Sequence, residues 1–249
     1  MTLVAPDQNE ATKIRGLKLL ALAVPKGFDV GPVAALLDDA RLADKARSSL
    51  QDMSTPESGK ALCDYLAKAK PEFACSILDS LGFMKNAAAV EAVRAMTKNE
   101  NAAVRASAAR ALAWTGDPAN LAMVQDVIKA ADDATRDAAT DALYRLLGAM
   151  AERGGNWQIA IDTYKDLLKT AKGQYLDAAL AGLGQYGDGT CVKPILDVIK
   201  DTPVVSQRVG LKALEQLKGR DAARAIADSY AAAPVALKPG LVWALGTKK

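Results

Sequence analysis

The stretch AVRASAARALAWTGDPANL, from Ala103 to Leu121, decides the fold. Alanine is the best helix former, and small side chains let helices pack closely, so the residues up to Leu112 predict a packed helix. The Gly-Asp-Pro sequence at 116–118 predicts that the chain turns there. The stretch holds two arginines and a tryptophan but no recognisable reactive group. We therefore interpret it as a structural module and expect the same pattern elsewhere in the chain.

Leucines equivalent to Leu112 recur at a spacing of 31 residues, with one longer gap of 40. They are Leu50, Leu81, Leu112 and Leu143, followed after the gap by Leu183, Leu214 and Leu245. We call these seven residues the marker leucines. The residue before each marker is small. The residue four positions before each marker lies on the same helical face as the marker. An earlier helix with the same periodicity, such as Leu62 with Leu66, precedes most markers. A fixed period of this length indicates a helical repeat protein.

The pattern predicts an all-α fold, a right-handed α-solenoid (an α-α superhelix) of about seven helix pairs. The first helices are expected on its convex side and the second helices on its concave side. The small residue before each marker is expected to let neighbouring helices approach closely. Prolines are predicted at the start of second helices, at Pro71, Pro203 and Pro234. Glycines are predicted where second helices end, at Gly116, Gly148, Gly187 and Gly219.

The ends and the longer gap divide the chain further. Residues 1–28 are predicted to form a capping helix, apolar between Ile14 and Val24 and broken by Pro25 and Gly27, and residues 29–249 to form the repeat array. The nine extra residues of the gap predict an insertion near 148–158, GAMAERGGNWQ, at one edge of the solenoid, where partners often bind. The last unit stops at VWALGTKK without a polar helix to cover it, so we expect that end to continue or to dock.

Composition excludes several classes of function. The 32 basic and 29 acidic residues are balanced, whereas nucleic-acid binding favours a basic stripe. The chain has no histidine, so it lacks the usual general base and the commonest transition-metal ligand. Its three cysteines, Cys63, Cys75 and Cys191, show no CxxC spacing and are interpreted as small buried hydrophobes. We expect no catalytic residue, metal or cofactor.

Nothing in the sequence suggests a membrane protein. No apolar run reaches the length of a membrane span, and no small-residue cleavage site of a signal peptide is evident. The expectation is a soluble protein, cytoplasmic by default, although a leader removed earlier would leave no trace.

Four stretches resemble the HEAT-repeat family, in particular the short type named after phycobilisome-lyase HEAT-like repeats. They are VRASAARALAWTGDP, TRDAATDALYRLLG, SQRVGLKALEQLKG and LLDDARLADKARSSL, and the resemblance covers roughly residues 29–249. Family units carry an Asp in the turn and an Arg or Lys early in the second helix. Three pairs fit this loosely: Asp39 with Arg47, Asp133 with Arg136, and Asp201 with Arg208. The resemblance implies a non-catalytic scaffold that binds a protein or peptide through its concave face or insertion edge.

Candidate binding residues come from two patterns. Positions two before the markers read Ser48, Asp79, Arg110, Asp141, Ala181, Lys212 and Trp243. They form either a ladder in which Asp79, Arg110 and Asp141 neutralise one another or a polar strip that sets the register of a partner. The arginines Arg105, Arg110, Arg136 and Arg208 either contact an acidic peptide or phosphates, or bond the turn of an adjacent repeat. Trp157 is either an exposed anchor or a filler of the space at the insertion.

Two other functions remain open. HEAT-like alkylpurine DNA glycosylases use concave tryptophans and a carboxylate in a basic groove, for which Trp243 and Asp141 are the candidates. That function predicts binding that weakens steeply with salt. A phycobilin-lyase-like chaperone is the other alternative, without a cysteine or metal site to nominate. Di-iron deoxyhypusine hydroxylases, HEAT-like enzymes that use His-Glu pairs, are excluded because this chain has no histidine.

Overall fold

The computed structural model describes residues 2–5, 7–22, 24, 28–153 and 155–248. Within these ranges the chain is all-α, with fifteen α-helices, seven short 3-10 helices and no strand. It divides into two compact units. Unit 1 comprises Met1–Thr115 and Ala119–Leu146, and unit 2 comprises Gly116–Pro118 and Leu147–Lys249.

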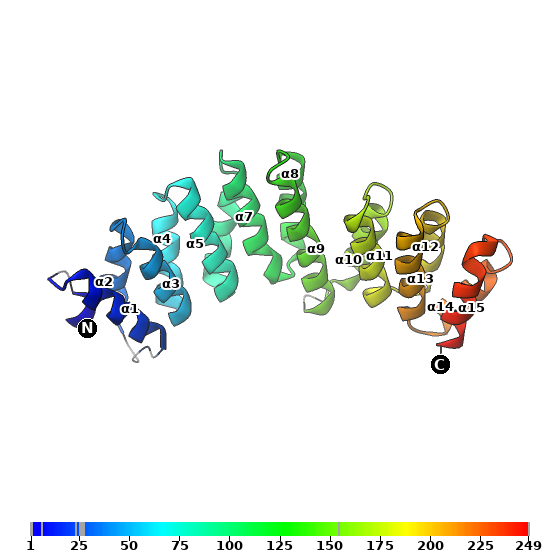
Figure 1. The fold of residues 1–249 in the computed structure, drawn as a ribbon, viewed down its shortest axis with the longest axis horizontal. Coiled ribbons are helices and arrows are strands. Elements are labelled where there is room, and N and C mark those ends of the chain that lie inside the picture. Colours follow the sequence, from blue (N-terminus) through cyan, green and yellow to red (C-terminus); the bar gives the residue numbers. More distant parts are fainter. Residues whose placement is uncertain (1, 6, 23, 25–27, 154, 249) are drawn as a thin grey trace. The chain divides into compact units, whose positions relative to one another are not determined.

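Unit 1 is a stack of helices from α1 to the first part of α9 (Figure 1). Its α-helices are α1 (Glu10–Leu22), α2 (Gly31–Ala34), α3 (Ala43–Met53), α4 (Pro56–Leu66), α5 (Pro71–Met84), α6 (Val90–Met96), α7 (Ala102–Leu112), α8 (Leu121–Lys129) and α9 (Arg136–Glu152), which continues into unit 2. The 3-10 helices η1 (Thr2–Val4), η2 (Ala35–Asp38), η3 (Ala87–Ala89), η4 (Ala113–Thr115) and η5 (Pro118–Asn120) flank them.

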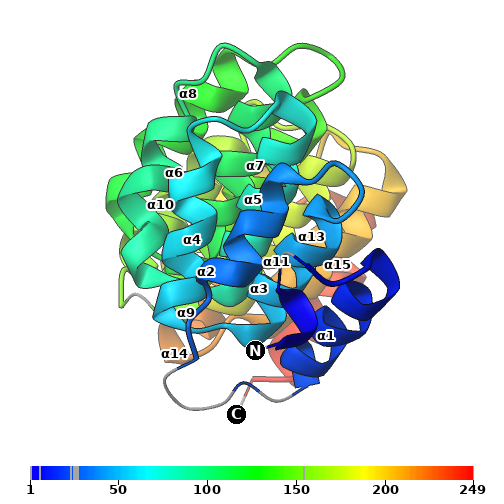
Figure 2. The same ribbon diagram turned by 90° about the vertical axis from the view of Figure 1, so that its left-hand side faces the viewer.

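Unit 2 repeats the same helix-pair pattern. Its α-helices after α9 are α10 (Trp157–Leu167), α11 (Gln174–Tyr186), α12 (Val192–Ile199), α13 (Val204–Gln216), α14 (Arg220–Ser229) and α15 (Lys238–Gly246), with 3-10 turns η6 (Gly189–Cys191) and η7 (Val235–Leu237) leading into α12 and α15. The side view in Figure 2 shows the paired character of the helices in unit 1, where α2, α4 and α6 lie beside α3, α5 and α7.

The marker leucines all fall in the second helices, as predicted. They lie in α3, α5, α7, α9, α11, α13 and α15, and all are buried except Leu245, which is half-buried. The small residues before them are buried as well. Among the described residues the structure therefore contains seven helix pairs at the predicted period. Each unit is a stretch of α-solenoid, which confirms the predicted fold class.

Small residues let neighbouring second helices touch at the backbone. A Cβ atom built on Gly82 of α5 would lie 2.9 Å from Cα of Ala111 in α7. A Cβ atom built on Gly184 of α11 would lie 2.6 Å from Cα of Ala213 in α13. Each glycine directly follows one marker leucine, and each alanine directly precedes the next. The predicted close approach is therefore confirmed at equivalent positions of both units.

The predicted helix starts and ends are right in most places, but Gly148 lies within a helix and Gly219 directly precedes α14 rather than ending α13. Pro71 begins α5, and Pro203 directly precedes α13. Gly116 follows α7 with a φ of +63°, in the region that favours glycine, and Gly187 caps α11. Gly148 does not end a helix, because α9 continues through it to Glu152.

A contact explains why α9 runs on. The hydroxyl of Tyr186 donates a hydrogen bond of 2.7 Å to Glu152 Oε1, which holds the added turn of α9 against α11. Part of the extra sequence therefore lengthens α9 to 17 residues, and α10 begins at Trp157.

The N-terminal helix α1 packs against α3, the second helix of the first pair. Leu17 is buried in this contact, and Ser49 Oγ donates a hydrogen bond of 3.0 Å to the Leu17 carbonyl. Pro25 and Gly27, which were expected to break the helix, lie outside the described residues. In the described ranges, no helix combines the length and the apolar character that crossing a membrane requires.

Candidate interaction surfaces

Two ion pairs on the second helices of unit 1 involve the candidate residues. Asp79 Oδ1 on α5 lies 2.5 Å from Arg110 Nη2 on α7, which is the predicted pair between neighbouring repeats. In the ladder alternative Arg110 also neutralises Asp141, and the structure does not show this second pair. Arg145 takes that place, with Nε 2.6 Å from Asp141 Oδ2, because residues four apart on one helix are neighbours.

An exposed aromatic side chain lies beside the first of these pairs. Phe83 follows Asp79 by four residues on α5, which places both on one face of the helix. Its side chain is 72 % exposed, which leaves the aromatic ring available for contact with another molecule. Arg110 completes this corner of the surface through its ion pair with Asp79. We call Asp79, Phe83, Arg110, Asp141 and Arg145 the second-helix stripe.

A shallow groove lies on the same row of helices, between α1 and α3. Its volume is about 170 Å³, and Ser48, the position of α3 equivalent to Asp79, forms part of its wall. Ile14, Leu17 and Ala21 supply apolar lining, and Lys18, Lys45 and Asp52 supply charge. The groove thus adds apolar and charged groups of α1 to the face formed by the second helices of unit 1.

Two of the candidate arginines bond turns of the solenoid. Arg105 Nη1 donates to the carbonyls of Asn99 at 2.9 Å and Glu100 at 2.8 Å, and its Nη2 donates to that of Ala130 at 3.0 Å. Arg136 Nη2 donates to the carbonyl of Ala131 at 2.9 Å. These contacts favour the interpretation in which the arginines join turns, including the turn of the adjacent repeat.

In unit 2 a glutamine bonds a turn of the solenoid in the same way. Gln207 Nε2 donates a hydrogen bond of 3.1 Å to the carbonyl of Thr202. Gln207, like Arg105 and Arg136, stands seven positions before its marker. Arg208, the predicted candidate, comes one residue later and is exposed.

The remaining candidates of unit 2 lie on three separate elements. Trp157 is the first residue of α10 and 48 % exposed, near the exposed Ile159. Lys212 on α13 pairs with Glu215 at 3.0 Å. Trp243 on α15 is 69 % exposed. The structure does not gather these three side chains into one site.

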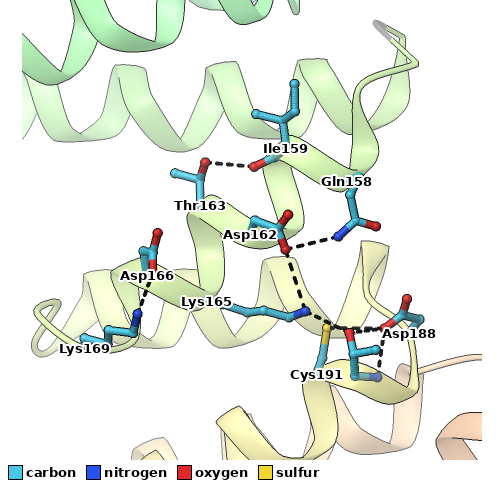
Figure 3. A network of polar contacts seen from close by, with 10 residues as sticks. Gln158, Ile159, Asp162, Thr163, Lys165, Asp166, Lys169, Asp188 and Cys191 are labelled. Atoms are coloured by element: carbon cyan, nitrogen blue, oxygen red, sulfur yellow. Dashed lines mark hydrogen bonds and ion pairs between the residues drawn. The ribbon is translucent and has the colours of Figure 1, made fainter.

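A polar network joins α10 to η6 in unit 2 (Figure 3). Lys165 Nζ donates a hydrogen bond of 2.8 Å to Thr190 Oγ1, and Asp188 accepts from both the backbone and the hydroxyl of Thr190. These hydrogen bonds, with the Thr190 hydroxyl first, lower the pKa of Asp188. Cys191 is fully buried beside them, and burial raises the pKa of its thiol. The network therefore connects α10 with η6, the turn that leads into α12, and the Cys191 thiol beside it stays protonated.

The other cysteines and the acidic residues suggest no metal site. Cys63 and Cys75 are half-buried and unpaired as disulfides. In the part of the chain that the structure describes, no three residues of His, Cys, Asp or Glu converge to hold a metal ion.

A larger groove, which the sequence did not predict, lies among the first helices of unit 1. It has a volume of about 500 Å³ between the α2–η2 segment and α4. Lys68 Nζ lies 2.8 Å from Asp38 Oδ1 and 4.4 Å from the ring centroid of Tyr65. The hydrogen bond from Lys68 lowers the pKa of Asp38, and burial raises that of the Tyr65 phenol. We call this the first-helix groove.

Part of the chain matches a known repeat family. Residues 34–144 match the family model described as HEAT repeats. No curated protein sequence matches the chain.

Three solved structures are similar to this chain, and the first of them supports a likeness in fold. The crystal structure of an engineered protein is 15 % identical with a TM-score of 0.50, covering 98 % of this chain and 76 % of that one. Human deoxyhypusine hydroxylase in complex with glycerol is 17 % identical with a TM-score of 0.40, covering 99 % and 93 %. The complex of CpcE and CpcF of phycocyanin lyase from Nostoc is 15 % identical with a TM-score of 0.46, covering 89 % of both chains.

Proposed function

We propose that this chain, whose residues 34–144 match the family model described as HEAT repeats, is a non-catalytic scaffold that binds a protein partner through the second-helix stripe. HEAT repeats typically mediate protein interactions. The observation that carries the proposal is Phe83, 72 % exposed beside the Asp79–Arg110 ion pair. Aromatic side chains in contact with a partner are enriched among the residues that dominate binding energy.

The packing beneath Phe83 supports this role. Gly82, the preceding residue, lies against Ala111 of α7 with no space for a larger side chain. The backbone that presents Phe83 is therefore fixed by the contact between repeats. A surface that is already ordered loses less conformational entropy on binding, which favours affinity. The charged side chains around Phe83 would set orientation and partner choice.

The nucleic-acid alternative receives less support from the same surface. Arg105 and Arg136, two of the arginines it requires, direct guanidinium donors at turn carbonyls. Asp79, Asp141 and their partner arginines leave the stripe close to electrical balance. Phosphate binding requires an excess of positive charge instead.

Site-specific photocrosslinking tests the proposal. Phe83 is replaced by the photoreactive amino acid p-benzoylphenylalanine, and the protein is irradiated in a lysate of its native organism. The same replacement at Val235 of unit 2, which is also highly exposed, serves as the matched control. The proposal predicts a discrete protein adduct from position 83 that persists after nuclease treatment. Identical adduct patterns from both positions, or no protein adduct from position 83, would contradict it.

A further inference from the structure

The first-helix groove combines an apolar lining with charged walls. Val30, Ala34, Leu37 and Ala61 contribute aliphatic surface, and the Tyr65 ring closes one side. Its volume of about 500 Å³ lies within the range of roughly 300 to 1,000 Å³ that is typical of ligand sites. The groove is formed by α2, η2 and α4, elements that contribute no residue to the second-helix stripe.

Negative charge exceeds positive charge along the groove. Four carboxylates line it, those of Asp29, Asp38, Glu57 and Asp64, against the two ammonium groups of Lys60 and Lys68. Each lysine already has a carboxylate partner: Lys60 lies 2.6 Å from Asp64, and Lys68 lies 2.8 Å from Asp38. The pairing leaves Asp29 and Glu57 without a cationic partner among these residues.

The two remaining carboxylates stand at helix starts. Asp29 Oδ1 accepts a hydrogen bond of 2.9 Å from the backbone N–H of Gly31, where α2 begins. Glu57 is in the first turn of α4. Both residues are exposed, so their negative charge faces solvent where they line the groove. Asp38, by contrast, is already neutralised by Lys68, whose ammonium group also lies over the Tyr65 ring.

We propose that the first-helix groove binds a basic segment of a protein partner. A Lys or Arg side chain of the segment pairs with Asp29 and Glu57, and a neighbouring aliphatic side chain packs on Val30, Ala34 and Ala61. Charge complementarity selects this occupant, because the surplus of carboxylates repels acidic peptides and nucleic acids. The volume fits a few side chains of an extended or helical segment.

Peptide titration tests this proposal directly. The probe is a fluorescein-labelled 12-residue peptide of alternating Lys and Leu pairs with blocked ends, and its counterpart carries Glu in place of Lys. Fluorescence anisotropy is measured with the full chain at 50 mM salt. We expect saturable binding of the Lys-Leu peptide, no binding of the Glu-Leu peptide, and weaker binding at 300 mM salt because exposed charges are screened.

Variants locate the binding. Removing both spare carboxylates in D29N/E57Q should weaken binding roughly three- to tenfold, as expected for two exposed charge pairs. The matched control E72Q/D126N removes two exposed charges elsewhere on unit 1 and should change affinity less than twofold. A61R, which places a bulky cation in the groove, should weaken binding more than tenfold. F83A should leave it unchanged, which separates this site from the second-helix stripe.

The outcomes are decisive in both directions. Absence of saturable binding by the Lys-Leu peptide would overturn the proposal, as would equal losses in D29N/E57Q and E72Q/D126N. Equal binding of both peptides would also overturn it, because charge then plays no part. Circular dichroism verifies that each variant retains the helical content of the parent protein.

Discussion

Substituting Gly184 with alanine is expected to destabilise the protein, although alanine is the better helix former. The added Cβ would lie 2.6 Å from Cα and 2.9 Å from Cβ of Ala213, so α11 and α13 must move apart. Overpacking of this kind costs typically about 1–3 kcal/mol. The helix-propensity gain of replacing glycine offsets about 1 kcal/mol. We therefore expect a net loss of about 0–2 kcal/mol in the free energy of unfolding.

Gly148 provides the matched control. It also lies within a helix, and the nearest atom to a Cβ built there is Tyr186 Oη at 3.7 Å, an ordinary contact. Gly148→Ala should therefore stabilise by about 0.5–1 kcal/mol through propensity alone. Urea unfolding followed by circular dichroism compares the two midpoints, with slopes checked for equality. If Gly184→Ala stabilised as much as Gly148→Ala, the close backbone contact between repeats would be refuted.

Three further predictions concern single side chains. Arg105→Ala removes hydrogen bonds from a guanidinium to three carbonyls and should lower the free energy of unfolding, measured in urea, by about 1.5–3 kcal/mol. The control Arg208→Ala should change it by less than about 0.5 kcal/mol, and equal effects of the two substitutions would refute the turn-bonding role of Arg105. Burial, with the hydrogen bond to Glu152, raises the pKa of Tyr186 to about 12, whereas the pKa of a tyrosine in the unfolded chain is about 10. The stability that this shift contributes is present below pH 10 and is lost as pH rises from 10 towards 12. Ultraviolet titration should show one late-ionising tyrosine in the parent protein that is missing in Tyr186→Phe, and identical titration curves would contradict this. In the insertion-edge alternative, Trp157→Ala should weaken partner binding at least several-fold without shifting the unfolding midpoint; unchanged affinity in calorimetry would remove this edge from the binding surface.

The repeat was predictable because its cause is local and periodic. A buried leucine and the small residue before it recur at fixed spacing, since each helix pair buries the same face against its neighbours. Leu112 and Ala111 therefore predict helix, burial and close packing together. The 31-residue period also places Asp79 beside Arg110, so this ion pair could be predicted from the spacing of the two residues in the sequence.

Other features depend on contacts that numbering does not show. Gly148 was expected to end a helix, but Tyr186 holds the added turn through Glu152, a partner 34 residues away. Asp141 has two arginines within reach by sequence, and the one on its own helix prevails. The first-helix groove is formed by side chains of two first helices. The first helices carry no residue that recurs as regularly as the marker leucines of the second helices, so their common surface was harder to infer from the sequence. Asp38 and Lys68 stand 30 residues apart, nearly one period, which is the signal that would have revealed the pair.

The division into two units likewise does not follow from the markers. The boundary between Leu146 and Leu147 falls inside α9, the helix that the extra residues lengthen. The capping role of residues 1–28 and the partner-binding edge near 148–158 remain predictions. Deleting residues 1–28 tests the capping role, and substitutions near 148–158 test the partner-binding edge.

Affinity capture with a disabled stripe tests the central claim most directly. The parent protein and the double variant F83A/R110E are used as bait in a lysate of the native organism, each with and without nuclease, and recovered proteins are quantified by mass spectrometry. The account predicts one protein recovered in stoichiometric amount by the parent, retained after nuclease, and reduced more than tenfold with the variant, because the aromatic anchor and its charged neighbour are both lost. Equal recovery by both baits, or loss of all recovered protein on nuclease treatment, would contradict a protein-binding scaffold that acts through the second-helix stripe.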